Sequence, residues 1–382
     1  MAPVRTDDLA ALPLAELLRR NTSLDPAAIE DVVMGCANQA GEDNRNVARM
    51  ALLLAGYPTT VGGITVNRLC ASGMCAVADA ARAIATGSGD LYVAAGAEHM
   101  TRGPWVISKA STPFGRDSEM HDSSFGWRFI NPRMHELYGT DAMGQTAENL
   151  AELHHISRED QDEFALRSQQ KAYRAQREGR LEQETMTVSI ARKKGDPIAF
   201  VADEFIKPDS NPEALAKLRP AFRKDGSVTA GNSSGLNDGA AAMLLASEQG
   251  MKDHDLKPLA RIVSSAVAGV EPRIMGIGPV EASRKALERA GLTLAEMDVL
   301  ELNEAFAAQV LACTRSMGLA DDDPRINPNG GAIALGHPLG MSGTRIIQAA
   351  ALQLKRTGGR YALATMCIGV GQGYAVVIEG MN

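Results

Sequence analysis

Uninterrupted apolar runs alternate with helix-like segments along this chain of 382 residues. Residues 89–99 and 359–369 remain apolar without polar alternation, which is typical of strands buried on both faces. Between the runs, residues 74–85 and 344–354 carry apolar positions at helical spacing. This strand–helix–strand order predicts βαβ units and mostly parallel sheets, and therefore an α/β fold.

The same unit is written twice in the sequence. Residues 24–37 and 294–305 each have a helix-ending stretch, an Asp-Val pair, an apolar strand and a turn of small residues. We interpret the chain as a pseudo-duplication of one α/β half, with a chance likeness between buried strands as the alternative. The second half opens with an extra strand at residues 258–270, whereas the first half opens directly with a helix at 9–20. A first strand is therefore expected to be missing.

The repeat also divides the chain into domains. We expect an N-terminal half at residues 1–250 and a C-terminal half at 251–382. Residues from about 103 to 220 belong to neither repeat and hold polar loops (108–126), a periodic helix (142–153) and a charged helical segment (158–180). They are expected to form a loop domain inserted in the first half, and long insertions of this kind usually carry function.

Composition narrows the functional class. Only 4% of the residues are aromatic and the formal net charge is −7, so neither a stacking surface nor a basic field for nucleic acid is expected. No run of 18 apolar residues suggests a membrane span, and the N-terminal stretch lacks a signal-peptide pattern. The five cysteines lack CxxC spacing, and the histidines lack metal-ligand spacing beside them. We expect a cytoplasmic protein with reduced thiols, no metal and no membrane partner.

Cys70 is the first candidate for chemistry. It lies in NRLCASG (67–73), where a loop meets the start of a helix, so unpaired amides and the helix dipole would favour a thiolate. Small neighbours would let a substrate carbonyl approach closely. The alternative is a buried structural cysteine, and local sequence leaves both open. Cys75, one turn later, is expected in the core.

Three further motifs end on turns of the same kind. His337 lies in the glycine-rich NGGAIALGHPLGMSG (329–343), where it is expected to act as a base. Cys367 leads into CIGVGQG (367–373), whose amides could hold an oxyanion; a dinucleotide site is the weaker alternative, because no βαβ unit follows. Asn303 lies in ELNEAF (301–306), where Glu304 is expected to cap the next helix.

These motifs, in this order and spacing, resemble the thiolase family from about residue 5 to the C-terminus. The resemblance implies two βαβαβαββ halves stacked as αβαβα layers with an inserted loop domain. It also implies that Cys70 is acylated, that His337 takes its proton and that Cys367 exchanges a proton with the acetyl-CoA enolate. Asn303 with His337 would form one oxyanion site, and the amides of Cys70 and Gly369 the other.

Coenzyme A is implied as a co-substrate, with no tightly bound cofactor. Residues 229–238 resemble the family's pantetheine loop, which places Ser234 and Ala230 against CoA. Met143 and Phe306 match apolar contacts near the thioester, and Lys207 falls where some relatives carry an arginine near the nucleotide. Family members are dimers or tetramers, so a homo-oligomer is expected.

Residues 36–57 and 126–132 are especially similar to thiolases of aromatic-acid catabolism that cleave 3-oxoadipyl-CoA to succinyl-CoA and acetyl-CoA, in the β-ketoadipate and phenylacetate routes. Their acyl chain ends in a carboxylate, so a cation is expected in the loop domain, with Arg128 and Arg133 as candidates. The alternatives are an acetoacetyl-CoA or general 3-ketoacyl-CoA thiolase, or a thiolase-fold CoA- or lipid-binding protein without turnover. The family's opening strand and R-T-P-x-G stretch are absent from this sequence.

Overall fold

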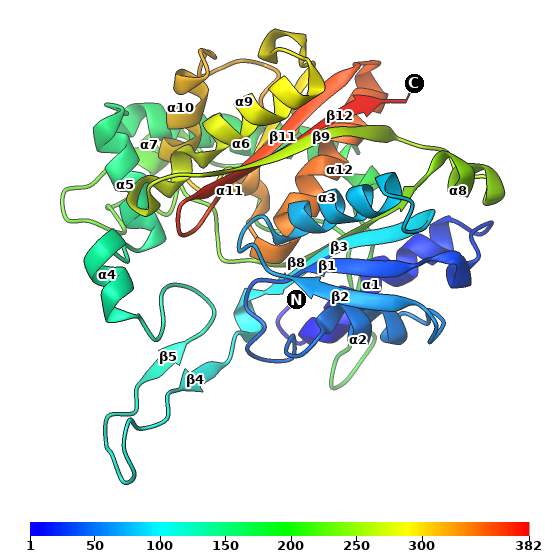
Figure 1. Cartoon of the computed structure of the whole chain (residues 1–382). Helices are drawn as coiled ribbons and strands as arrows, with labels where there is room; N and C mark the ends of the chain where they lie inside the picture. The colour runs from blue at the N-terminus through cyan, green and yellow to red at the C-terminus, as the bar shows by residue number, and fades with distance from the viewer. Residues whose placement is uncertain (382) are drawn as a thin grey trace.

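A computed structural model describes residues 1–381 and arranges them in alternating layers of helices and sheets (Figure 1). The strands are β1 (Asp31–Gly35), β2 (Gly62–Val66), β3 (Leu91–His99), β4 (Trp105–Ile107), β5 (Met120–Asp122), β6 (Val188–Ile190), β7 (Ile198–Phe200), β8 (Asp238–Ala246), β9 (Ala260–Gly269), β10 (Val299–Leu302), β11 (Tyr361–Ile368) and β12 (Gln372–Gly380). The helices are α1 (Thr6–Arg20), α2 (Val47–Leu54), α3 (Ser72–Ala85), α4 (Pro132–Tyr138), α5 (Met143–Leu153), α6 (Arg158–Arg177), α7 (Pro212–Ala216), α8 (Glu248–Asp253), α9 (Gly278–Ala290), α10 (Ala307–Ser316), α11 (Ala332–Leu335) and α12 (Leu339–Thr357).

Helices α3 and α12 form the middle layer, with one four-stranded sheet on each side (Figure 1). Helices α1 and α2 cover the outer face of the first sheet, and α9 covers the outer face of the second. Each layer buries its apolar face against the next, which is how an α/β domain excludes water from its sheets. The result is the αβαβα stack expected from the sequence.

The first sheet has the order β2-β1-β3-β8 and the second β10-β11-β12-β9. In the first sheet β1 runs parallel to β2 and β3, and only β8 is antiparallel to its neighbour. In the second sheet only β10 and β11 pair in parallel. In each sheet three strands share one direction, as expected, but in the second sheet the reversed strand β12 lies between β11 and β9, so two of the three pairings there are antiparallel. A short turn joins β11 to β12, and a connection without a crossover helix can only pair strands antiparallel.

The two sheets differ at one edge. In the second sheet, β12 pairs with β11 on one side and with β9 on the other. Its counterpart in the first sheet is β8, which within residues 1–381 pairs only with β3. A groove of about 420 Å³ runs along this edge of β8, between α1 and residues 200–205. Both sheets have four strands, but within residues 1–381 no strand pairs beside β8 in the place that β9 takes beside β12. That relatives carry a strand in this place stays a prediction.

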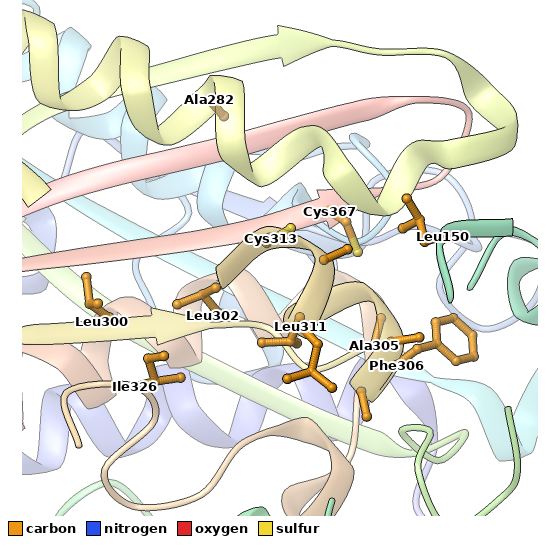
Figure 2. Close-up of a cluster of buried hydrophobic side chains, with 14 of the residues drawn as sticks. Leu150, Ala282, Leu300, Leu302, Ala305, Phe306, Leu311, Cys313, Ile326 and Cys367 are labelled. Carbon is orange, nitrogen blue, oxygen red and sulfur yellow. The ribbon is translucent and has the colours of Figure 1, made fainter. Parts of the chain in front are cut away.

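Three apolar clusters hold the layers together. One lies between α1, α2 and the first sheet, and a second surrounds the α3–α12 layer. The third joins the second sheet to α5, α9 and α10 (Figure 2). Leu300 and Leu302 of β10 lie in this cluster with Leu311 of α10, and Cys367 of β11 is a fully buried member beside Cys313 (Figure 2). The end of β11, which carries Cys367, is therefore fixed by the core.

Local sequence sets the helix ends. Helix α12 ends at Gly358, whose φ of 71° is the left-handed conformation that glycine adopts without a steric penalty. Helix α6 begins with a capping box, in which the side chains of Ser157 and Asp160 each accept a hydrogen bond from the other's backbone amide. This satisfies two amides at the start of a helix whose sequence is rich in charged residues. None of the helices within residues 1–381 combines the length and apolarity needed to cross a bilayer.

The segment between β3 and β8 contains α4 to α7 and two small hairpins. The hairpin β4–β5 projects from the layers (Figure 1), in a region for which the sequence suggested only polar loops. Helices α5 and α6 lie close to the predicted segments. Their contacts with α10 and α11 bring the inserted segment onto the second half.

Candidate active site

Cys70 lies in the loop between β2 and α3, two residues before the helix begins. Leu69 precedes it with a φ of 47°, a conformation that costs a bulky residue about 1–2 kcal/mol. Asn67 stabilises the turn, because its side-chain oxygen accepts a hydrogen bond from the Leu69 amide at 2.9 Å. The loop thereby places Cys70, a half-buried residue, in the wall of a cavity.

The cavity beside Cys70 has a volume of about 210 Å³. It is formed by loops of both halves and of the inserted segment. Its lining includes Ala37, Asn38, Leu69, Cys70, Glu98, Ser123–Arg128, Met143, Leu339, Gly369 and Val370. A mostly apolar wall with a few polar groups is typical of a small-molecule site.

Burial keeps Cys70 protonated. It raises the pKa of the thiol to about 11, although the amide of Gly369 donates a hydrogen bond to the sulfur and opposes the shift. The expectation that the start of α3 favours a thiolate is therefore wrong for the free protein, because desolvation outweighs the amides. A nucleophilic Cys70 would need a base to remove its proton.

His337 has the side chain suited to act as this base. It is 5% exposed and lies just before α12. Its Nδ1 lies 2.7 Å from the Ser342 hydroxyl, which itself donates to the Pro338 carbonyl at 3.0 Å. Since that hydroxyl proton is used, Nδ1 carries the hydrogen and Nε2 is the acceptor side of the ring. Burial lowers the pKa of the imidazole to about 4, so it is neutral and able to accept a proton.

Asn303 lies beside the imidazole of His337. It follows β10 directly and is 2% exposed, and its Nδ2 lies 3.4 Å from His337 Nε2. The loop after β10 and the turn between α11 and α12 thus bring together an amide donor and an imidazole nitrogen that becomes a donor once it is protonated. Glu304 does not cap α10; it is buried and accepts hydrogen bonds from Ser168, Asn327 and the Ile333 amide, which gives it a structural role.

Cys367 lies near the end of β11 and is fully buried. Burial raises the pKa of its thiol well above the ordinary value, and the nearby Cys70 sulfur raises it further. The turn after β11 includes Val370, whose φ is 63°. The Cys70 loop and this turn, which both line the cavity, therefore each contain a strained bulky residue. Such strain persists only where surrounding structure imposes it, and it concentrates at functional sites.

The predicted CoA contacts separate into two groups. Met143 lines the cavity, and Phe306 lies at the start of α10 with its ring 5.9 Å from that of Phe222. The Ser234 amide donates to the Ala305 carbonyl at 3.0 Å, so the 229–238 loop runs beside the ELNEAF segment, with Ala230 exposed. Lys207 is exposed and lies over the Phe205 ring at 5.2 Å, away from the residues that line the cavity.

The two candidate cations are also separated. Arg128 lines the cavity, donating to Asn38 Oδ1 at 3.0 Å and to the Ser123 carbonyl at 3.4 Å. No carboxylate within residues 1–381 pairs with it at ion-pair distance. Arg133 is exposed on α4, and the cavity does not include it.

Three polar residues of the site lie outside the motifs recognised in the sequence or had no role predicted in them: Asn38, Glu98 and Ser342. Asn38 holds Arg128, Glu98 lines the cavity, and Ser342 fixes the His337 tautomer. A signal existed for Ser342, five residues after His337 in the same loop and helix start. None existed for Glu98, which looks like the polar end of an apolar strand.

Known proteins resemble the chain over nearly its whole length. A 3-oxoadipyl-CoA/3-oxo-5,6-dehydrosuberyl-CoA thiolase of Escherichia coli K12 is 59% identical over 379 residues, which are 99% of this chain and 94% of that protein. A beta-ketoadipyl-CoA thiolase of Pseudomonas knackmussii is 57% identical with the same coverage.

A solved structure and two family models also match the chain. The crystal structure of an acetyl-CoA acetyltransferase of Bacillus anthracis superposes with a TM-score of 0.91 at 40% identity, covering 100% of this chain and 94% of that one. The expected fold class is thereby confirmed. Residues 1–249 match the thiolase N-terminal domain and residues 256–380 the thiolase C-terminal domain, so the chain belongs to the thiolase family.

Proposed function

We propose that this chain is a 3-oxoadipyl-CoA thiolase, which uses CoA to cleave 3-oxoadipyl-CoA into succinyl-CoA and acetyl-CoA. Membership of the thiolase family makes it an acyltransferase acting on CoA thioesters. The acyl group is assigned by similarity to the 3-oxoadipyl-CoA and beta-ketoadipyl-CoA thiolases, together with the cation in the cavity beside Cys70.

Acylation begins with proton transfer from Cys70 to Nε2 of His337. The imidazole is neutral and its Nε2 carries the lone pair, with only a long 3.4 Å contact to Asn303 Nδ2, which suits it to this step. The Cys70 sulfur then bonds to the 3-oxo carbonyl carbon, and the oxygen gains negative charge. The Cys70 and Gly369 amides, both directed at the sulfur, would stabilise that oxygen.

Cleavage of the bond between C2 and C3 follows. The electron pair moves onto the acetyl-CoA fragment, whose thioester oxygen takes enolate charge near Asn303 and His337. Cys367 gives its proton to the enolate carbon and becomes a thiolate, and acetyl-CoA leaves. The succinyl group stays on Cys70 as a thioester.

Transfer to CoA reverses the proton movements. The Cys367 thiolate takes the proton of the incoming CoA thiol, whose sulfur attacks the succinyl carbonyl. Cys70 leaves as a thiolate and recovers its proton from His337. One thioester replaces another, so the transfer is nearly balanced in free energy. Ser234, Ala230, Met143 and Phe306 would contact the CoA chain; Lys207 would contribute only from the exposed surface.

The position of Arg128 in the cavity supports succinyl as the acyl group. A guanidinium without an acidic partner, in a mostly apolar cavity beside the nucleophile, suits a substrate that brings its own carboxylate. Succinyl on Cys70 ends in such a group. Arg128 alone is the proposed partner of this carboxylate, because Arg133 does not line the cavity.

Replacing Arg128 tests the proposal. Arg128→Ala should lower kcat/KM for 3-oxoadipyl-CoA about 10- to 100-fold through KM, the effect of one charged hydrogen-bonded contact, and leave acetoacetyl-CoA within about twofold. Arg133→Ala is the matched control and should change neither. Equal losses on both substrates would remove Arg128 from acyl-chain recognition.

An acetoacetyl-CoA thiolase is the second candidate. The B. anthracis acetyl-CoA acetyltransferase shares the fold, and the acetyl group needs no cation. A higher kcat/KM for acetoacetyl-CoA than for 3-oxoadipyl-CoA in the unmodified protein would establish it instead. A thiolysis scan over acyl chains, run before any mutagenesis, decides between the two.

The setting of the enzyme is part of the proposal. All five cysteines are free, which supports a reducing compartment, and we place the enzyme in the cytoplasm. We also propose a homodimer or homotetramer with a loop domain at 103–220, a division of the chain near residue 250 and a role in aromatic-acid degradation. The projecting β4–β5 hairpin, which exposes Trp105 and Ile107, supports the oligomer.

A further inference from the structure

Glu98 is a buried carboxylate at the junction of the two halves. It lies near the end of β3, is 2% exposed and lines the cavity beside Cys70. Its Oε1 accepts a hydrogen bond from the Asn38 amide at 3.0 Å. Its Oε2 accepts from the Ala37 and Gly340 amides, each at 2.9 Å. One side chain therefore joins the loop after β1 to the start of α12.

The approach of α12 to this carboxylate is unusually close. A Cβ on Gly340 would lie 2.5 Å from the Ala97 carbonyl oxygen and 2.8 Å from that of Gly35, so only glycine fits. The first turn of α12 thus rests on the backbone of the first sheet. A carboxylate also complements the unpaired amides at the start of a helix. Glu98 fixes the helix where the two halves touch.

One branch of this contact leads to the base. Gly340 lies two residues before Ser342, which accepts from His337 Nδ1 and donates to the Pro338 carbonyl within the same turn. The position of Gly340 therefore sets the position of the Ser342 hydroxyl, and with it the direction in which His337 Nε2 points. A displacement of about 1 Å at such a group can lower a rate about 100-fold.

The other branch leads to the acyl cavity. With its backbone held by Glu98, Asn38 accepts from Arg128 through Oδ1 and donates to the Ser123 hydroxyl at 3.2 Å. The neighbouring Ala37 carbonyl accepts from the Asn67 side chain at 2.9 Å, and Asn67 shapes the turn before Cys70. The loop after β1 consequently touches both the cation and the nucleophile turn.

Other roles for Glu98 fit less well. Cys36, Asp43 and Glu98 offer donor atoms within 4.8 Å of one another, as a metal site would. Both Glu98 oxygens are, however, already engaged by amides, which a bound cation would have to displace. The same engagement makes Glu98 a poor proton acceptor for substrate. Burial raises the pKa of its carboxyl to about 6, which leaves it ionised at neutral pH.

We propose that Glu98 is a positioning residue that aligns the His337 base with the Arg128 end of the acyl cavity, through Gly340 on one side and Asn38 on the other. The Arg128 branch rests on the proposed function. The His337 branch does not, because any substrate that acylates Cys70 needs the base.

Glu98→Gln tests both branches, since the amide side chain keeps one acceptor and turns N–H groups toward amide N–H groups. We expect kcat for acetoacetyl-CoA to fall at least 10-fold with KM within about twofold, as for a misplaced base. Alkylation of Cys70 by iodoacetamide, followed by mass spectrometry, should slow by a similar factor. The ratio of kcat/KM for 3-oxoadipyl-CoA to that for acetoacetyl-CoA should also fall.

Two further variants separate the branches from general damage. Asn38→Ala keeps the backbone amide but frees Arg128, so it should lower the substrate ratio and leave the alkylation rate unchanged. Glu148→Gln alters another buried carboxylate, which accepts from the Ser227 and Val228 amides, and should lower the melting temperature without changing alkylation.

Unchanged alkylation and an unchanged substrate ratio in folded Glu98→Gln would overturn the proposal. If that variant does not fold, Glu98→Asp, whose carboxylate is one methylene short of the amides, is judged by the same two values. If 3-oxoadipyl-CoA proves not to be a substrate, slowed alkylation still establishes the His337 branch. A failure of the proposed function is thereby distinguished from a failure of this one.

Discussion

Cys70 of the first half is a half-buried residue in the wall of a cavity, whereas Cys367 and His337 of the second half are almost completely buried. The first half also contributes Asn38 and Glu98 to the cavity wall, and the inserted segment contributes Arg128. The second half contributes groups whose protonation is controlled by desolvation. In the proposed mechanism the two halves therefore supply different chemistry: the first half meets the acyl group, and the second half moves protons.

Removal of the nucleophile should give the largest effect. Cys70→Ala is expected to lower thiolysis by about 10⁴-fold or more, because no other group can carry the acyl chain. Mass spectrometry after mixing with acetyl-CoA should show no acyl adduct. Cys75→Ala, one turn further along α3, should keep the adduct and lose about 1 kcal/mol of stability. An adduct on Cys70→Ala would place the nucleophile elsewhere.

Removal of the second thiol should separate the two steps. Cys367→Ala is expected to slow exchange of the acetyl-CoA methyl protons with D2O about 10²- to 10⁴-fold, the usual range for a lost acid/base. Acylation of Cys70 should remain detectable. Cys313 is the control, because it is also buried, with its pKa raised to about 12, and lies within the α10 core. Equal loss of exchange in Cys313→Ala would mean that core packing, not proton transfer, was disturbed.

The buried imidazole should leave a signature in stability. The His337 pKa is lowered to about 4, so on acidification the unfolded chain binds this proton first, near pH 6.5. The contribution of neutral His337 is therefore complete above about pH 6.5 and is lost as pH falls toward 4, by about 3 kcal/mol at most.

Urea unfolding of the wild type and of His337→Gln between pH 7 and 4 measures this difference. The wild type should lose more stability than the variant over that range. Glu301, whose pKa is raised to about 8 by burial, acts with the opposite sign in both proteins and cancels in the difference. Parallel curves would show that the imidazole is hydrated, which would weaken the contrast between the halves.

Much of the layer arrangement was predictable, because it depends on periodicity. The buried runs became β3 and β11, the periodic segments fell within α3 and α12, and the repeat was found in two sheets. The direction of β12 was not predicted, because a strand's apolar pattern is the same in parallel and antiparallel pairs. The β4–β5 hairpin was missed for a related reason: its short strands are largely exposed and carry no buried-strand signal.

The site divides in the same way. The sequence by itself determined which side chains stand near the ends of elements, because Cys70 and His337 precede helices, Asn303 follows a strand and Cys367 lies near a strand end, each in a recognisable motif. Only the tertiary structure decided their protonation, because desolvation depends on what surrounds a group and not on its neighbours in the chain. Only the tertiary structure distinguished Arg128, which lines the cavity, from Arg133, which does not. It also placed Glu98 between Asn38 and Gly340, although Gly340 lies 242 residues after Glu98 in the sequence.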